Sequence, residues 1–407
     1  MGKQKSKDDV VIVSAARTPF GRFGGMLKDV PSVDLGVAVV NEVMRRFGRQ
    51  DIHIDEVIFG CCAQCEFKTL APVVARQILL KVGLPPETVS ITLDRACCSS
   101  LAAVQIAQRN IETRNADVVL AGGVENMSRL PYLIRDLRWG TRLGDVKLVD
   151  DLFGMESAPG YGAVAVDAGE VALEYGFKRE DQDQWAYNSQ MRYQTALAQG
   201  KYEDEIFPIS IPQKKGPPLI FSRDEFPKPD TTIEGLGKLS TVYGSPTVTA
   251  GNAPGLDAGA SAVVMMSRGK AEEYGIRPLA RVLTVQSVAG EPHYMAMVPA
   301  TAIKKALAKA QLSLEDLDLI EINEAFAAMP LVSLKVLAEM DDKRMKRLVE
   351  ITNVNGDAIA IGHPVGASGC RVLMTLIYEL RRRGGKYGAA TLCGGLAQGD
   401  AAIVEAE

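Results

Sequence analysis

Continuous apolar runs mark the strands that this sequence predicts. Residues 9–15, 55–60, 118–123 and 317–322 are short runs rich in Val, Ile or Leu, and two of them end at Gly. Strands that are apolar on both faces are typical of parallel or mixed sheets with helices on both sides. The pattern therefore predicts an α/β fold.

Two apolar helices are each followed by a strand that ends in a pair of glycines. The first begins at Ser99 or Ser100, either of which can cap it, and runs to about residue 115, before the strand 118–123. The second covers 371–383 and precedes a strand at 389–395. The similar spacing of the two units indicates an internal duplication. The first helix is apolar almost all round, which predicts a place in the middle of a layered structure.

The segment 125–245 differs in amino-acid composition from the segments on either side of it. Prolines, aromatic residues and charges are mixed there, and one amphipathic helix is predicted at about 179–200. We expect a loop-rich subdomain inserted between the two halves. Segments of this kind commonly carry substrate contacts.

Composition and charge exclude several classes of protein. The chain has 407 residues and a net charge of −4, which argues against a general nucleic-acid binder. No apolar run approaches the roughly 20 residues that span a bilayer. The charged N-terminal residues lack the apolar core of a secretion signal, so we expect a cytoplasmic protein without a membrane segment.

The seven cysteines do not favour disulfides or a metal centre. Their number is odd and two pairs are adjacent, which is a poor disulfide framework in a long chain. Cys61, Cys62 and Cys65 could supply part of a zinc site. A closed zinc site needs four ligands, however, and the chain has only three histidines from which to complete it. Small buried thiols are the better interpretation, and we expect no metal.

Two other cysteines are candidates for catalysis. Cys97 lies just before the first apolar helix, whose positive end would favour a thiolate, although a buried structural cysteine is also common there. Cys393 lies at a strand end and precedes Gly394 and Gly395, whose backbone a ligand could approach closely.

Polar candidates follow another strand and a tight turn. His363 lies in a Gly-His-Pro turn, where it could be a base or could stabilise the turn. Asn323 and Glu324 follow the strand 317–322, at the carboxyl end where such sheets place their sites, although Glu324 could also cap a helix.

Seven segments in this order resemble the thiolase family over nearly the whole chain. They are AARTPFGRFGG, AGGVENMS, EDQD, VTAGNAPGLDAGASAVV, INEAFAA, NVNGDAIAIGHPVGASG and GGKYGAATLCGG. The resemblance implies a duplicated five-layer αβαβα fold with two five-stranded mixed sheets. The N-terminal half would comprise 8–124 and 246–274, the loop subdomain 125–245, and the C-terminal half 275–407. A homodimer or homotetramer is expected.

The resemblance also implies a role for each candidate residue. Cys97, rather than Cys98, takes the nucleophile position because Leu101 anchors the alignment. His363 would accept its proton, and Cys393 would be the acid–base. His363 and a water held by Asn323 would form one oxyanion hole, and the N–H groups of Cys97 and Gly395 the other. Coenzyme A would be a substrate, with no permanently bound cofactor.

The substrate-binding positions depart from the family pattern. Phe326 would pack along the pantetheine arm, but Ala163-Val164-Ala165 replaces the usual His-Met-Gly. In the turn Ala253-Pro254-Gly255, Pro254 replaces a Ser that normally binds pantetheine. We therefore predict thiolysis, or the reverse condensation, of a bulky, branched or aromatic 3-oxoacyl-CoA.

Three further departures and three alternatives complete the sequence-based interpretation. Asp94 replaces Asn, Ser100 replaces Gly, and Asp357 replaces the second Gly of the Asn-Gly-Gly turn.

One alternative is an acetyl-CoA C-acetyltransferase for short linear substrates. Another is a thiolase-like subunit that depends on a small zinc-ribbon/OB-fold partner. An inactive scaffold is disfavoured because the four catalytic positions are retained.

Overall fold

Nine strands form one mixed sheet in the computed structural model, which describes residues 5–49, 51–66, 71–154, 158 and 160–407. Their order is β11-β12-β13-β10-β1-β9-β4-β2-β3. β2 is parallel to β3 and β4, and β11 is parallel to β12, whereas the other neighbours are antiparallel. The halves of the sheet meet where β1 pairs with β10 at Val11–Arg281 and Ile12–Ala280. The predicted α/β class is confirmed.

The strands of the main sheet are β1 (Val10–Arg17), β2 (Glu56–Gly60), β3 (Val89–Leu93), β4 (Val118–Asn126), β9 (Ala258–Ser267), β10 (Ala280–Ala289), β11 (Leu319–Ile322), β12 (Tyr387–Gly394) and β13 (Gln398–Ala406). The helices around it are α1 (Ser32–Phe47), α2 (Val74–Lys81), α3 (Ser99–Glu112), α8 (Arg268–Glu273), α9 (Val298–Ala310), α10 (Ala328–Leu337), α11 (Asp342–Ile351), α12 (Ala358–Ile361) and α13 (Ser368–Arg383).

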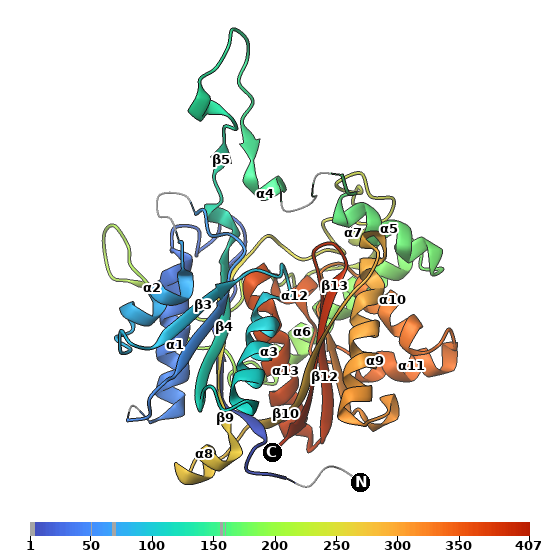
Figure 1. Ribbon diagram of the computed structural model, residues 1–407. Coiled ribbons are helices and arrows are strands. Elements are labelled where there is room, and N and C mark those ends of the chain that lie inside the picture. The colour runs from blue at the N-terminus through green and yellow to red at the C-terminus, as the bar shows by residue number, and fades with distance from the viewer. Residues whose placement is uncertain (1–4, 50, 67–70, 155–157, 159) are drawn as a thin grey trace.

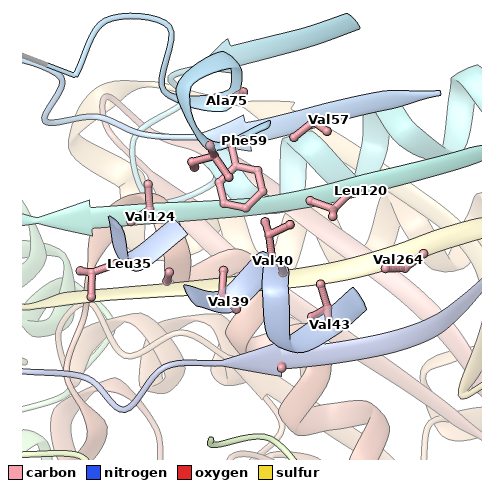
Figure 2. Packing of buried hydrophobic residues seen from close by; sticks show 14 of the residues in the cluster. Leu35, Val39, Val40, Val43, Val57, Phe59, Ala75, Leu120, Val124 and Val264 are labelled. Atoms are coloured by element: carbon pink, nitrogen blue, oxygen red, sulfur yellow. The ribbon is translucent and has the colours of Figure 1, made fainter. Parts of the chain in front are cut away.

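Alternating strand residues build the layers. On β2, Val57 and Phe59 pack against α1 and α2, whereas Ile58 between them faces the cluster that contains α3 and α13. Figure 2 shows the outer contact, with Val40 and Val43 of α1 lying over the sheet. In the second half, β12 places Ala390 and Leu392 toward α3 and α13, and Ala389 toward α9 and α10.

The helices α3 and α13 therefore form the middle of five layers (Figure 1). Both N-termini carry the segments that the sequence marked for chemistry, so the layered core holds the site. The predicted helix and strand of the first unit are found as α3 and β4. This layered arrangement is the duplicated αβαβα fold that the resemblance implied.

Two expectations about local structure are wrong. Within the described residues the second half contributes four strands rather than five, because Thr352 forms a single parallel bridge with Ile320 of β11 and no ladder. Neither Ser99 nor Ser100 caps α3, whose N-cap is Cys98. The Ser100 hydroxyl instead accepts a hydrogen bond from the backbone N–H of Cys370, at 3.0 Å, in the first turn of α13. It thus satisfies a free N–H group of the facing helix.

The segment 125–245 contains a projecting hairpin and two longer helices. The hairpin pairs β5 (Tyr132–Leu133) with β6 (Val149–Asp150), followed by α4 (Asp151–Gly154), and it extends away from the body (Figure 1). The long helices are α5 (Val164–Glu174) and α6 (Arg179–Ala198). The helix predicted at about 179–200 is found as α6, but its amphipathic character is not, because its buried face carries polar residues such as Gln182 and Ser189 beside Trp185. The remaining elements are β7 (Ile209–Ile211), β8 (Leu219–Phe221) and α7 (Ile233–Gly237).

Helices long and apolar enough to cross a membrane are absent from the part of the chain that the structure describes. The first four residues of the expected N-terminal tail lie outside that part.

Candidate active site

A thiol and an imidazole meet where the N-termini of α3 and α13 converge. Cys97 Sγ lies 3.0 Å from Nε2 of His363, although the two residues are far apart in the chain. Cys97 is half-buried and two residues ahead of α3, while His363 is buried in the turn between α12 and α13. A nucleophile and a base within hydrogen-bond reach are the basic unit of covalent catalysis.

The turn that carries Cys97 is tied to both halves of the protein. The Asp94 carboxylate accepts a hydrogen bond from the N–H of Ala96 at 2.8 Å, which closes a local side-chain turn ahead of Cys97. The Arg95 guanidinium binds Asp400 of β13 and the hydroxyl of Ser287 of β10. Ala96 has a φ of 46°, in the left-handed region that non-glycine residues rarely adopt. The network therefore fixes the nucleophile in a strained turn.

Two hydrogen bonds orient the His363 ring and backbone. The Ser368 hydroxyl donates to the carbonyl of Pro364 at 3.0 Å, so it accepts from Nδ1–H of His363, at 2.6 Å. This arrangement leaves the lone pair of Nε2 facing the Cys97 thiol. On the other side, the backbone N–H of His363 donates to the Asp257 carboxylate at 2.7 Å.

The charge state of His363 suits a proton acceptor. Burial, reinforced by the positive charge of Arg371, lowers the pKa of His363 to about 4, so the imidazole is neutral near pH 7. Burial also raises the pKa of Asp257 to about 7. The resting site therefore holds a neutral imidazole beside the Cys97 sulfur.

The Ser368 hydroxyl gives a prediction about the tautomer of His363. In Ser368→Ala the ring loses its Nδ1 acceptor, so both its tautomer and its orientation toward Cys97 become free. We expect acylation of Cys97 to slow by about tenfold to a hundredfold while binding of coenzyme A is retained. Rapid-quench kinetics of acyl-enzyme formation measures the first quantity and calorimetry the second. Equal losses in the acylation rate and in the affinity for coenzyme A would contradict the orienting role. Ser368→Thr, which keeps the hydroxyl, is the control.

The second thiol approaches the same turn from β12. Cys393 is fully buried, and burial raises its pKa to about 12, so it holds its proton. The following loop turns sharply, with Leu396 and Ala397 at φ values of 57° and 54°. A side chain at Gly395 would begin 3.3 Å from Cβ of Ala96. Two strained segments, each carrying a candidate oxyanion donor, thus face each other.

Asn323 lies immediately after β11 with its side chain fully buried. Its Oδ1 accepts a hydrogen bond from Nη2 of Arg371 at 2.9 Å. Its Nδ2 has no hydrogen-bond partner among the described residues. An unpaired buried donor costs about 1–3 kcal/mol, which a bound water or substrate oxygen would relieve. Glu324, by contrast, has its carboxylate held by Trp185, Ser189 and other donors.

Three of the five predicted substrate residues share an apolar cluster with Cys393. Cys393, Phe326, Ala253 and Val164 belong to one apolar cluster, in which α5 and α10 pack together with the short helix η3 (Pro292–Met297). A pocket of about 250 Å³ continues from Ala253 and is also lined by Phe226 and Lys228. Gly255 packs so closely on the Phe226 ring that a Cβ would clash with it at 2.5 Å. The structure gives no physical account of Pro254.

Comparison with known proteins decides the family. Residues 10–269 match the model of the thiolase N-terminal domain, and residues 276–406 match that of the thiolase C-terminal domain. This chain belongs to the thiolase family. It is an acyltransferase of the thiolase type, acting on acyl-CoA and coenzyme A.

Similar thiolases cover the full length of this one. An acetyl-CoA acetyltransferase of Syntrophomonas wolfei is 42% identical over 98% of this chain and 99% of its own. A beta-ketoadipyl-CoA thiolase of Acinetobacter baylyi is 40% identical over 97% of this chain and 98% of its own. Human mitochondrial 3-ketoacyl-CoA thiolase in complex with CoA has a TM-score of 0.91 at 38% identity, with complete coverage of both chains.

Three residues that contact the candidate site were not predicted as functional. Asp257 anchors the backbone of His363, Ser368 binds its ring, and Arg371 binds Asn323. Asp257 and Ser368 lie inside quoted motifs, so a buried carboxylate and a hydroxyl in such turns were available signals. Arg371 had none, because a basic residue in an apolar helix is ordinarily placed at its surface.

Proposed function

We propose that this thiolase cleaves 3-oxoacyl-CoA with coenzyme A through an acyl group on Cys97. The observation that carries the proposal is the 3.0 Å approach of Cys97 Sγ to Nε2 of His363, with the ring nitrogen free to accept the proton. The neutral state of the imidazole and the burial of Cys393 support the assignment of the remaining roles.

The first step breaks the carbon–carbon bond. Cys97 gives its proton to Nε2 of His363, and its sulfur attacks the 3-oxo carbon, with the oxyanion held by the N–H groups of Cys97 and Gly395. The bond between C2 and C3 then breaks, and its electron pair remains on C2 as the enolate of acetyl-CoA. The enolate oxygen lies between His363 and a water on Asn323, while Cys393 protonates C2.

The second step returns the enzyme to its starting state. The thiol of a second coenzyme A gives its proton to the Cys393 thiolate and attacks the acyl group on Cys97. The oxyanion is again held by the N–H groups of Cys97 and Gly395. The Cys97 sulfur then leaves and takes back the proton from His363. Reversal of both steps is the condensation of two acyl-CoA molecules.

A short linear acyl group is the first candidate substrate. The acetyl-CoA acetyltransferase names of several relatives support it, as do Met295 and Met329, which fill the apolar cluster near Cys393. A bulkier or dicarboxylic acyl group is the second candidate. Val164 and its alanine neighbours, together with the beta-ketoadipyl-CoA thiolase relative, favour that alternative.

We also propose that the protein works as a homodimer or homotetramer. β3 is an edge strand with Val89 and Ile91 exposed, and the projecting hairpin exposes Leu137, Trp139 and Leu143. Unpaired strand edges and exposed apolar patches are typical of protein interfaces. The division into 8–124 with 246–274, 125–245 and 275–407, and the zinc-ribbon/OB-fold partner, remain hypotheses.

Intact-protein mass spectrometry tests the proposed reaction. The enzyme is mixed with linear, branched, aromatic and dicarboxylic 3-oxoacyl-CoA esters while free coenzyme A is withheld. Attack by Cys97 releases acetyl-CoA and leaves the rest of the acyl chain on the enzyme, so the added mass names the substrate class. No adduct from any ester with the purified chain alone would count against the proposal, and recovery with a co-purified subunit would favour the partner hypothesis.

A further inference from the structure

Asp357 is a buried carboxylate at a position where the thiolase turn usually has Gly. It is the N-cap of α12, and its carboxylate accepts a hydrogen bond from the N–H of Ala358 at 2.6 Å. Its φ of −144° is extended backbone that any residue can adopt. The turn itself therefore does not require Gly, and the side chain is free to serve another purpose.

The Asp357 carboxylate forms a fully buried ion pair with Arg371. Nη1 of Arg371 binds Oδ2, and Nη2 binds Oδ1 at 3.1 Å, so the pair is bidentate. Neither side chain is exposed to solvent. The same Oδ1 accepts the backbone N–H of Glu324 at 2.9 Å, in the residue that follows Asn323. Asp357 therefore holds the Asn323 segment directly as well as holding Arg371.

Arg371 determines which way the Asn323 amide points. Its Nη2 donates to Oδ1 of Asn323 at 2.9 Å, and an arginine has no acceptor to offer the other end of the amide. The amide oxygen must therefore face Arg371, which turns Nδ2 away from it. Nδ2 has no partner among the described residues and remains available to a water or a substrate oxygen.

We propose that Asp357 is a positioning residue for the carbon–carbon bond step. Through Arg371 it fixes the Asn323 amide with Nδ2 directed at the water that donates to the enolate oxygen. The inference rests on the proposed function, because it takes Asn323 as the residue that holds that water. In the thioester step the oxyanion lies at Cys97 and Gly395 instead, so Asp357 affects one step and not the other.

The charges around Arg371 agree with this assignment. Asp357 raises the pKa of Arg371 above its ordinary value in spite of burial, so the guanidinium stays charged. Glu321 is also near, but burial raises the pKa of its carboxyl well above the ordinary value, and neither of its oxygens has a hydrogen-bond partner among the described residues. Asp357 is therefore the carboxylate that neutralises Arg371.

Asp357→Asn tests the proposal because it keeps the shape of the side chain and removes its charge. Two rates are compared: cleavage of acetoacetyl-CoA by coenzyme A, and exchange of labelled coenzyme A into acetyl-CoA, which needs the thioester step alone. We expect cleavage to fall by about tenfold to a hundredfold and exchange to change by less than about threefold. Parallel losses, or unchanged cleavage, would overturn the proposal. Should this variant not fold, Asp357→Gly is expected to show the same selective loss.

Asp224→Asn is the matched control for general destabilisation. Asp224 is also a fully buried carboxylate in a bidentate pair, with Arg17, and it also accepts a backbone N–H, from Phe20. Because it does not contact Asn323 or His363, any loss in this variant should affect both rates equally. A selective loss of cleavage in the control would overturn the inference.

The Asn323→Ala background distinguishes this inference from the proposed function. If Asp357 acts through Asn323, Asp357→Asn should have little further effect on cleavage once the amide is gone. An undiminished effect in that background would overturn the route through Asn323. Absence of an acyl adduct on Cys97 from any 3-oxoacyl-CoA ester in the unaltered enzyme would refute the proposed function itself, which is a separate observation.

Discussion

Cys97→Ala is expected to abolish the acyl-enzyme and to lower turnover of 3-oxoacyl-CoA by about 10⁴-fold or more. The reason is that alanine removes the sulfur that faces Nε2 of His363, and no other thiol is recorded within hydrogen-bond distance of that nitrogen in the described structure. Steady-state kinetics measures the loss, and intact-protein mass spectrometry shows whether the acyl group still attaches. An adduct that persisted on the protein would contradict the assignment of the nucleophile.

The adjacent cysteine provides the matched control for that experiment. Cys98 is fully buried, and its Sγ is directed at the carbonyl of Leu392, 3.7 Å away. Burial raises the pKa of Cys98 well above its ordinary value, which opposes nucleophilic attack. Cys98→Ala should keep the acyl adduct and cost about 1 kcal/mol of stability, measured by denaturant unfolding. Loss of the adduct in Cys98→Ala but not in Cys97→Ala would show that Cys98, rather than Cys97, is the nucleophile.

The family and the fold could be predicted from the sequence because both depend on short, local patterns. Apolar runs ended by Gly predicted β2 and β4, and the all-round apolar character of α3 predicted its place in the middle layer. The thiolase motifs then named Cys97, His363, Asn323 and Cys393. The structure brings Cys97 and His363 within hydrogen-bond distance, whereas the roles of all four remain to be tested.

The features that sequence could not predict depend on contacts between distant segments. Ser100 was expected to cap its own helix, but the meeting of two N-termini in the middle layer allows it to serve α13 instead. Thr352 lies beside β11 without continuing a ladder, which no run of residues could reveal. Arg371 has no signature in its own helix, because its partners Asp357 and Asn323 come from two other segments. The hydrophobic periodicity of a sequence does not predict long-range pairing of this kind.

Two strained turns hold the residues that we propose as oxyanion donors. Ala96 and the Leu396–Ala397 loop adopt left-handed backbone angles, and they are adjacent to Cys97 and Gly395, whose N–H groups we propose as the oxyanion donors. Strain of about 1–3 kcal/mol per residue persists where the surroundings impose it. Arg95, bound to Asp400 of β13, joins the nucleophile turn to the strand that begins just after that loop. The two donors are thus held in one rigid unit.

Cys393→Ala is expected to separate the two chemical steps. The variant loses the thiol that protonates C2, so cleavage of 3-oxoacyl-CoA should fall by about 10²–10⁴-fold. Exchange of labelled coenzyme A into acetyl-CoA should be retained more fully, because coenzyme A can lose its proton to bulk base before it attacks the acyl group on Cys97. Rapid-quench measurement of both rates in the same preparation gives the comparison.

Cys370→Ala controls for the loss of a buried thiol. Cys370 is fully buried on α13, its Sγ is directed at the carbonyl of Ser100, and burial raises its pKa to about 12, as it does for Cys393. The two thiols thus share burial and protonation and differ in position, since Cys393 belongs to the apolar cluster that also contains Phe326. If both variants lost cleavage activity to the same extent, the effect would come from packing, and Cys393 would not be the proton donor to C2. A loss of cleavage confined to Cys393→Ala would show that Cys393 is that donor.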